Sequence, residues 1–105
     1  MEAEALKNKV VEILDNKKGG DIAVIDMGQK SSVTDFFVIA TGKNNTHVKA
    51  LAEELEEKLE PEGVFVKRKE GINDARWVVL DYGEVIVHIF NSDTRDFYCL
   101  EKLWK

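Results

Sequence analysis

The sequence predicts an α/β protein in which helices pack on a five-stranded, mixed sheet. Three stretches have apolar residues at helical spacing, and five have the composition or alternation of β-strands. The two kinds of stretch are interspersed along a chain of 105 residues, in the order helix, two strands, helix, three strands, helix. This length suits one domain, so residues 1–105 are expected to form a single domain.

The first expected element is a helix at residues 3–17. Its apolar residues recur on one helical face, with Glu and Lys between them: Leu6, Val10, Ile13 and Leu14. Lys17 and Lys18 suit the negative end of the helix dipole, and the glycine pair at 19–20 is expected to stop the helix.

Two strands are expected next. Residues 21–27, DIAVIDM, are a short β-rich run, and residues 28–34 are polar and read as a loop. Residues 35–42, DFFVIATG, are almost continuously apolar, which is typical of a strand covered on both faces.

The second long helix is expected to start at the capping residues 44–46, Asn-Asn-Thr, and to run to about Glu60. Its apolar stripe consists of Val48, Leu51, Ala52, Leu55 and Leu59. Pro61 and Gly63 end the helix. Residues 64–71 then alternate and finish in charge, which predicts an edge strand protected by Lys and Arg.

A β-hairpin is expected at residues 76–90, with its turn centred on Tyr82-Gly83. That turn sets Asp81 opposite Glu84, Val79 opposite Ile86, and Trp77 opposite His88. One face is aliphatic and must meet the core: Val78, Leu80, Val85, Val87 and Ile89. The other is mixed: Trp77, Val79, Asp81, Ile86, His88 and Phe90.

After the hairpin, residues 91–93 can cap a short helix that carries Phe97, Leu100 and Trp104.

The mixed face of the hairpin is the best candidate for a binding surface. Aromatic side chains such as Trp77 suit such a surface because they bury much area at low entropic cost. The structural alternative is that Trp77 covers the end of the sheet and His88 bonds to a neighbour. Because all these side chains gather on one face, a binding role and a structural role are about equally well supported.

Composition limits the partners. The net charge of −5 argues against direct binding of free nucleic acid, which requires a basic surface. The lone Cys99 excludes an internal disulfide and fits a reducing compartment. The sequence has neither an export signal at its start nor an apolar run near the ~20 residues of a membrane span. A cytoplasmic protein is therefore expected, with an organelle as the alternative if a transit peptide has been removed.

The sequence contains no complete catalytic or cofactor-binding motif. Residues 41–46 follow a strand as a phosphate loop would, but Phe37 occupies the position of the first glycine and Asn44 that of the Ser or Thr. No metal-ligand spacing links the histidines and the cysteine, and a nucleophile site of Cys99 with His88 and Asp81 is rejected because Cys99 lies in an apolar helix. No cofactor is expected.

Several longer motifs carry a family resemblance over almost the whole chain. They are KGGDI at 18–22, SSVTDFFVIATG at 31–42, HV at 47–48, EG at 70–71, WVVLDYGEVIVHIF at 77–90 and RDFYCLEKLW at 95–104. Together these motifs are specific, and the chain resembles the ribosomal silencing factor family, also called the Iojap family.

The resemblance implies a nucleotidyltransferase-like fold without the chemistry, since the paired-aspartate and Gly-Ser signature is absent. It implies binding to the large ribosomal subunit through ribosomal protein fourteen, at the face that meets the small subunit. The bound factor then blocks subunit joining sterically and represses translation. The resemblance also implies a role near late large-subunit assembly and a homodimer as one form of family members.

The residues expected to bind the partner are Trp77 as anchor, with Asp81, Tyr82 and His88 beside it, and Asp35, Lys30, Arg95 and Tyr98 in second rank. Arg95 and Tyr98 have the alternative of locking the tail onto the sheet. Two other functions stay open: an assembly factor that does not silence translation, and a nucleotidyltransferase-like enzyme that uses Asp26, Asp35 or Asp81 with Mg²⁺.

Overall fold

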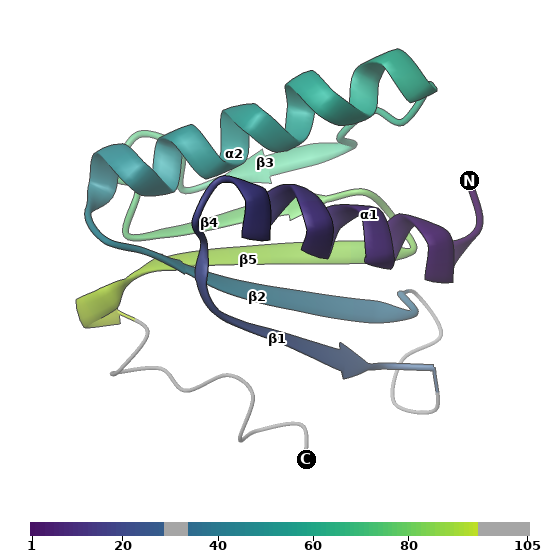
Figure 1. Ribbon diagram of the computed structural model, residues 1–105, viewed down its shortest axis with the longest axis horizontal. Helices are drawn as coiled ribbons and strands as arrows, with labels where there is room; N and C mark the ends of the chain where they lie inside the picture. The colour runs from purple at the N-terminus through teal and green to yellow at the C-terminus, as the bar shows by residue number, and fades with distance from the viewer. Residues whose placement is uncertain (29–33, 95–105) are drawn as a thin grey trace.

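The computed structural model describes residues 1–28 and 34–94, and these form a mixed sheet with two long helices (Figure 1). The elements are α1 (Ala3–Asn16), β1 (Gly20–Asp26), β2 (Phe36–Gly42), α2 (Asn45–Leu59), a 3₁₀ turn (Glu60–Glu62), β3 (Arg68–Glu70), β4 (Trp77–Asp81) and β5 (Val85–Asn91). The strand order is β1-β2-β5-β4-β3. Strands β2 and β5 are parallel and the other neighbours antiparallel, so the predicted five-stranded mixed sheet is confirmed.

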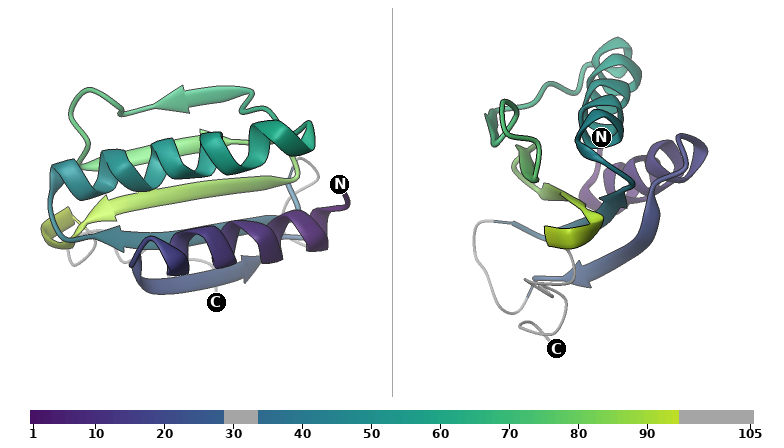
Figure 2. Two further views of the ribbon diagram at one scale, coloured as in Figure 1. Left: turned by 45° about the horizontal axis from the view of Figure 1, so that its top comes forward. Right: turned by 90° about the vertical axis from the view of Figure 1, so that its left-hand side faces the viewer.

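Helices α1 and α2 lie side by side on one face of the sheet (Figure 2). The main core lies between them and the sheet, and the aliphatic residues of the hairpin point into it as predicted. Val78, Leu80, Val85, Val87 and Ile89 are all fully buried. Neither described helix has the length and apolar character needed to cross a membrane.

The end of α1 differs in detail from the prediction. The residue that takes the left-handed conformation after the helix is Lys18, with φ 67°, and not a glycine. Gly19 is needed for another reason, because a Cβ there would lie 3.0 Å from the carbonyl oxygen of Leu14. Gly20 already belongs to β1.

Helix α2 begins as predicted. The side chain of Asn44 accepts a hydrogen bond from the backbone N–H of His47 at 2.8 Å, which satisfies one of the free donors of the first turn. After the 3₁₀ turn, Gly63 adopts φ 79° and turns the chain toward the sheet.

The edge strand is shorter than predicted. The sequence favoured strand over residues 64–71, but only Arg68–Glu70 pair with β4. Val64 instead donates its backbone N–H to Leu59 at the end of α2, so this part of the segment serves the helix terminus.

The predicted register of the hairpin is wrong by two residues. Trp77 pairs with Phe90, Val79 with His88 and Asp81 with Ile86. Tyr82 donates its backbone N–H to Val85, so the turn residues are Gly83 and Glu84. Gly83 has φ 89°, a conformation that favours glycine at this position of a tight hairpin turn. A shift of two residues keeps every side chain on its predicted face.

The chain after β5 turns into a helix at residues 92–94. Asn91 caps it, since its side-chain oxygen accepts from the backbone N–H of Thr94 at 2.8 Å. The residues expected further along this helix, Phe97, Leu100 and Trp104, lie outside the described part of the chain, as does Cys99.

Candidate functional site

The face of the sheet opposite the helices carries the mixed set of side chains that the alternation predicted. We call it the Trp77 face, after Trp77, Val79, Asp81, Ile86, His88 and Phe90. Ile39 and Phe90 are fully buried there and form a second, smaller apolar cluster, against which Ala23, Ile25 and Trp77 pack. This face thus has an apolar base of its own beneath its polar groups.

Trp77 and His88 are joined by a hydrogen bond at the centre of this face. The indole Nε1–H of Trp77 donates to Nδ1 of His88 at 3.0 Å. The two residues are not direct cross-strand partners, because Trp77 pairs with Phe90 and His88 pairs with Val79. The hydrogen bond therefore joins diagonal neighbours on the adjacent strands β4 and β5. Trp77 also stacks on Phe90 with ring centroids 5.0 Å apart, so the half-buried indole is held in one orientation.

The bond from Trp77 fixes the state of His88. Because Nδ1 accepts a hydrogen bond, the proton of the neutral ring must be on Nε2. Burial lowers the pKa of His88 to about 4, so the ring is neutral at physiological pH. His88 is therefore unsuited to act as a general acid or base near neutrality.

A hollow of about 290 Å³ opens on the Trp77 face. It is lined by Phe37, Arg68, Glu70, Trp77, Val79, Asp81, Ile86 and His88. Apolar side chains and His88 come from the three central strands, and the charged ones come from β3 and the end of β4. The result is a mostly apolar depression with a charged border, the usual plan of a protein-binding surface.

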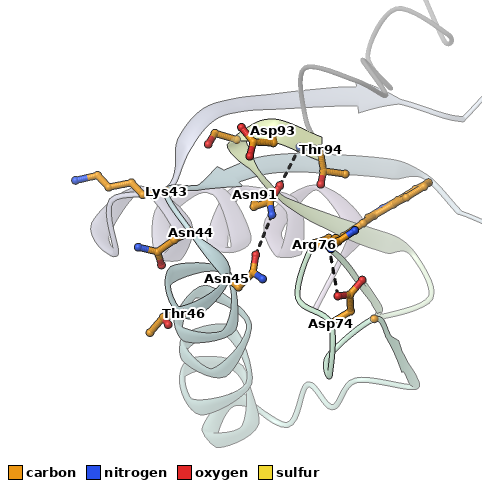
Figure 3. A pocket seen from close by; sticks show the side chains of 12 residues that line it. Lys43, Asn44, Asn45, Thr46, Asp74, Arg76, Asn91, Asp93 and Thr94 are labelled. Atoms are coloured by element: carbon orange, nitrogen blue, oxygen red, sulfur yellow. Dashed lines mark hydrogen bonds and ion pairs between the residues drawn. The ribbon is translucent and has the colours of Figure 1, made fainter.

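A larger recess of about 1100 Å³ lies at the carboxyl ends of β2 and β5 (Figure 3). Trp77 is among the residues that line it. Asn91 donates a side-chain hydrogen bond to Asn45 at 2.8 Å, which ties the end of β5 to the start of α2. Arg76 forms an ion pair with Asp74, with 3.5 Å between its Nε and Oδ1 of the carboxylate. Lys43 and Asp93 also line the recess, so its charges are balanced.

Comparison with known proteins identifies the family. A family model described as "Ribosomal silencing factor during starvation" matches residues 1–105. The chain belongs to the ribosomal silencing factor family. It is 43% identical to "Ribosomal silencing factor RsfS" of Bacillus subtilis over 86% of this chain and 76% of that protein.

Further relatives give the same result. A crystal structure of a protein from Chromobacterium violaceum superimposes with a TM-score of 0.94 at 36% identity, over 99% of this chain and 87% of that chain. A more distant relative, the mouse "Mitochondrial assembly of ribosomal large subunit protein 1", is 30% identical over 90% of this chain and 43% of its own length. The resemblance to the silencing factors is therefore confirmed.

The structure places some of the predicted site residues of this silencing-factor chain together. Trp77, Asp81 and His88 line the same hollow. Asp81 also accepts a hydrogen bond from the backbone N–H of Gly83 at 2.7 Å, so its carboxylate stabilises the turn. Arg68, Glu70 and Phe37 join the hollow without having been predicted, because the pairing of β3 with β4 and of β2 with β5 cannot be read from one strand at a time.

Tyr82 does not lie beside Trp77, and this prediction is wrong. It follows Asp81 directly, so its side chain points to the opposite face, where it is buried in the main core. Asp35 is exposed at the start of β2, and its backbone N–H donates to Glu84 at the hairpin turn. Lys30, Arg95 and Tyr98 lie outside the described residues.

The described residues give no support to a metal site. Within residues 1–28 and 34–94, no three His, Cys, Asp or Glu residues are close enough to hold a metal ion, so Asp26, Asp35 and Asp81 form no such cluster. His47 is engaged structurally: its Nδ1 accepts from the backbone of Lys43 and its Nε2 lies 3.0 Å from the carbonyl oxygen of Lys17. This histidine connects the start of α2 to the end of α1.

Proposed function

We propose that this chain binds the large ribosomal subunit through ribosomal protein fourteen and sterically blocks joining of the small subunit. The Trp77 face is the docking surface, and the action takes place in the cytoplasm. The observation that carries the proposal is the half-buried indole of Trp77, held by Phe90 and His88 at the rim of a mostly apolar hollow.

Such an indole has the properties of a binding anchor. Its orientation is already fixed in the free protein, so little conformational entropy is lost when a partner covers it. The charge of the chain is −5, which complements a basic ribosomal protein. The names of the relatives connect the family with ribosomes and, in mouse, with assembly of the large subunit.

The test is a subunit-joining assay. Purified large subunits are sedimented with the protein, small subunits are then added, and the fraction of joined ribosomes is measured. We expect co-sedimentation with the large subunit and fewer joined ribosomes. A protein that neither co-sediments nor lowers the joined fraction does not silence translation in this way.

Trp77→Ala tests the docking surface. Loss of a buried anchor is expected to weaken binding by about 2 kcal/mol or more. Phe65→Ala is the matched control, because Phe65 is an exposed aromatic side chain, 62% accessible, that does not line the hollow. Equal affinity of a folded Trp77→Ala variant and the unchanged protein would remove Trp77 from the interface.

An assembly role is the second candidate, and the name of the mouse relative favours it. The two functions share one docking surface and differ in their consequence. An assembly factor is expected to leave immature large subunits behind when it is deleted, whereas a silencing factor leaves mature subunits that join too readily under starvation.

Light scattering of the purified chain tests the homodimer that the resemblance implies.

A further inference from the structure

We infer that the hollow on the Trp77 face receives a neutral carbonyl oxygen of the protein partner, which accepts a hydrogen bond from Nε2 of His88. This inference rests on the proposed function and adds the chemistry that the docking surface recognises. It makes His88 a specificity-determining residue, in addition to its role as the hydrogen-bond acceptor that orients Trp77.

The first observation is that the Nε2–H of His88 is an unsatisfied hydrogen-bond donor among the described residues. Nδ1 of His88 is occupied by the Trp77 indole, so Nε2 carries the proton and must donate. Nε2 is buried and has no hydrogen-bond partner in the part of the chain that the structure describes. Buried polar atoms without partners are rare and costly in native proteins, and an acceptor supplied by a partner would remove that cost.

The second observation is the position of this atom. His88 is 7% exposed and lines the hollow. In an imidazole ring Nε2 is farther from the backbone than Nδ1, so it lies at the outer end of a side chain that stands on the sheet. Val79, the cross-strand partner of His88, and Ile86, two residues away on β5, are half-buried beside it.

The charges around the hollow select the acceptor. Glu70 and Asp81 contribute two carboxylates and Arg68 one guanidinium, so the border is net negative. A carboxylate or a phosphate oxygen would be repelled there, and bringing it into an apolar depression would cost desolvation. A backbone carbonyl or a side-chain amide oxygen avoids both costs. The same reasoning favours a protein surface over the phosphate backbone of RNA.

Two substitutions separate the two nitrogens of His88. His88→Asn places its side-chain oxygen near Nδ1 and can still accept from Trp77, but it has no donor at the position of Nε2. His88→Gln reaches the position of Nε2 with an amide N–H and gives up the acceptor at Nδ1. Affinity is measured with isolated ribosomal protein fourteen and with intact large subunits.

We expect His88→Asn to bind at least about tenfold more weakly, because the partner's carbonyl is left unpaired on docking. We expect His88→Gln to recover part of the affinity that His88→Asn loses, because it restores a donor at the position of Nε2, and to remain weaker than the unchanged protein, because it gives up the bond that orients Trp77. Equal affinities of a folded His88→Asn variant and the unchanged protein would overturn the inference. A loss seen only with intact subunits would overturn the protein acceptor in favour of an RNA one.

Nuclear magnetic resonance of the unchanged protein supplies a second readout that needs no variant. With ¹⁵N-labelled histidine, the Nε2 proton of His88 is expected to shift downfield and to exchange more slowly when isolated ribosomal protein fourteen is added. An unmoved resonance in a formed complex contradicts the inference. Failure of the unchanged protein to bind at all defeats the proposed function, whereas binding that needs Trp77 but not His88 defeats only the acceptor site.

Discussion

The two faces of the sheet use the same strands for different ends. Toward α1 and α2, β4 and β5 present aliphatic side chains that are fully buried by the chain's own helices. On the Trp77 face the same strands present a half-buried indole, a carboxylate, and a buried histidine whose Nε2 has no hydrogen-bond partner among the described residues. Strand alternation thus places core side chains and the side chains of the proposed docking surface on opposite faces, residue by residue.

The separation is not complete. Phe90 and Ile39 belong to the Trp77 face and are as deeply buried as any residue of the main core. Trp77 packs on this small cluster, so the proposed docking surface has an apolar base of its own. Among the described residues each face has one buried polar atom without a hydrogen-bond partner, the Tyr82 hydroxyl on the helix side and Nε2 of His88 on the Trp77 face, and His88 is the one that lines the hollow.

The largest expected contrast is between Leu80→Ala and Val79→Ala, neighbours in β4 that point to opposite faces. Leu80 is fully buried, and its truncation should lower the free energy of unfolding by about 3 kcal/mol, within the usual range for Leu→Ala in a core. Val79 is half-buried, and its truncation should cost about 1 kcal/mol or less. Urea unfolding measures both. Equal losses would show that the two faces contribute alike to stability.

The next contrast depends on pH. The lowered pKa of His88, about 4, lies below the value near 6.5 of an unfolded histidine. Between these values the unfolded state binds a proton and the folded state does not, so stability falls as the pH decreases. The expected loss is about 2 kcal/mol between pH 7 and pH 5.

His88→Asn is the control for that loss, because it removes the titrating ring. The other groups at the hollow, Arg68, Glu70 and Asp81, are present in both proteins, and so is His47. The difference between the two urea-unfolding series therefore isolates His88. A difference that stays constant from pH 7 to pH 5 would mean that His88 is not held neutral by burial.

The sequence was sufficient to predict which face of the hairpin each side chain occupies, but not to predict which residues of β4 and β5 pair. Alternation along residues 77–90 placed Val78 and Leu80 toward the core and Trp77 and His88 away from it, and the structure agrees. The turn was misplaced because both Tyr82-Gly83 and Gly83-Glu84 put a glycine at the bend. The backbone hydrogen bond from Tyr82 to Val85 and the pairing of β4 with β5 distinguish the two registers.

The hollow was beyond prediction from one sequence for a related reason. Arg68 and Glu70 reach it because β3 pairs with β4, and Phe37 because β2 lies parallel to β5. These contacts join segments far apart in the chain, and no local pattern specifies them. Tyr82, by contrast, was open to a better prediction, since it follows Asp81 and alternation sends it to the core.

A smaller effect is expected for Trp77→Phe. The shorter ring can still stack on Phe90, but the bond to Nδ1 of His88 is lost, which should reduce the free energy of unfolding by about 1 kcal/mol. A double-mutant cycle with His88→Phe measures the bond itself. A coupling energy near zero would show that the hydrogen bond to His88 does not contribute to holding Trp77.

The smallest effect is expected for Tyr82→Phe, on the helix side of the comparison. The Tyr82 hydroxyl is buried and has no hydrogen-bond partner among the described residues. Burial, followed by the nearby Glu56 and Glu60, raises the pKa of this phenol, so the group stays neutral. Removing an unpaired buried hydroxyl should leave stability unchanged or raise it by up to about 1 kcal/mol. Binding to the large subunit should not change, because Tyr82 points away from the Trp77 face. Unaltered unfolding with weakened binding would reverse that conclusion and return Tyr82 to the docking surface, since only contact with the partner would then explain the loss.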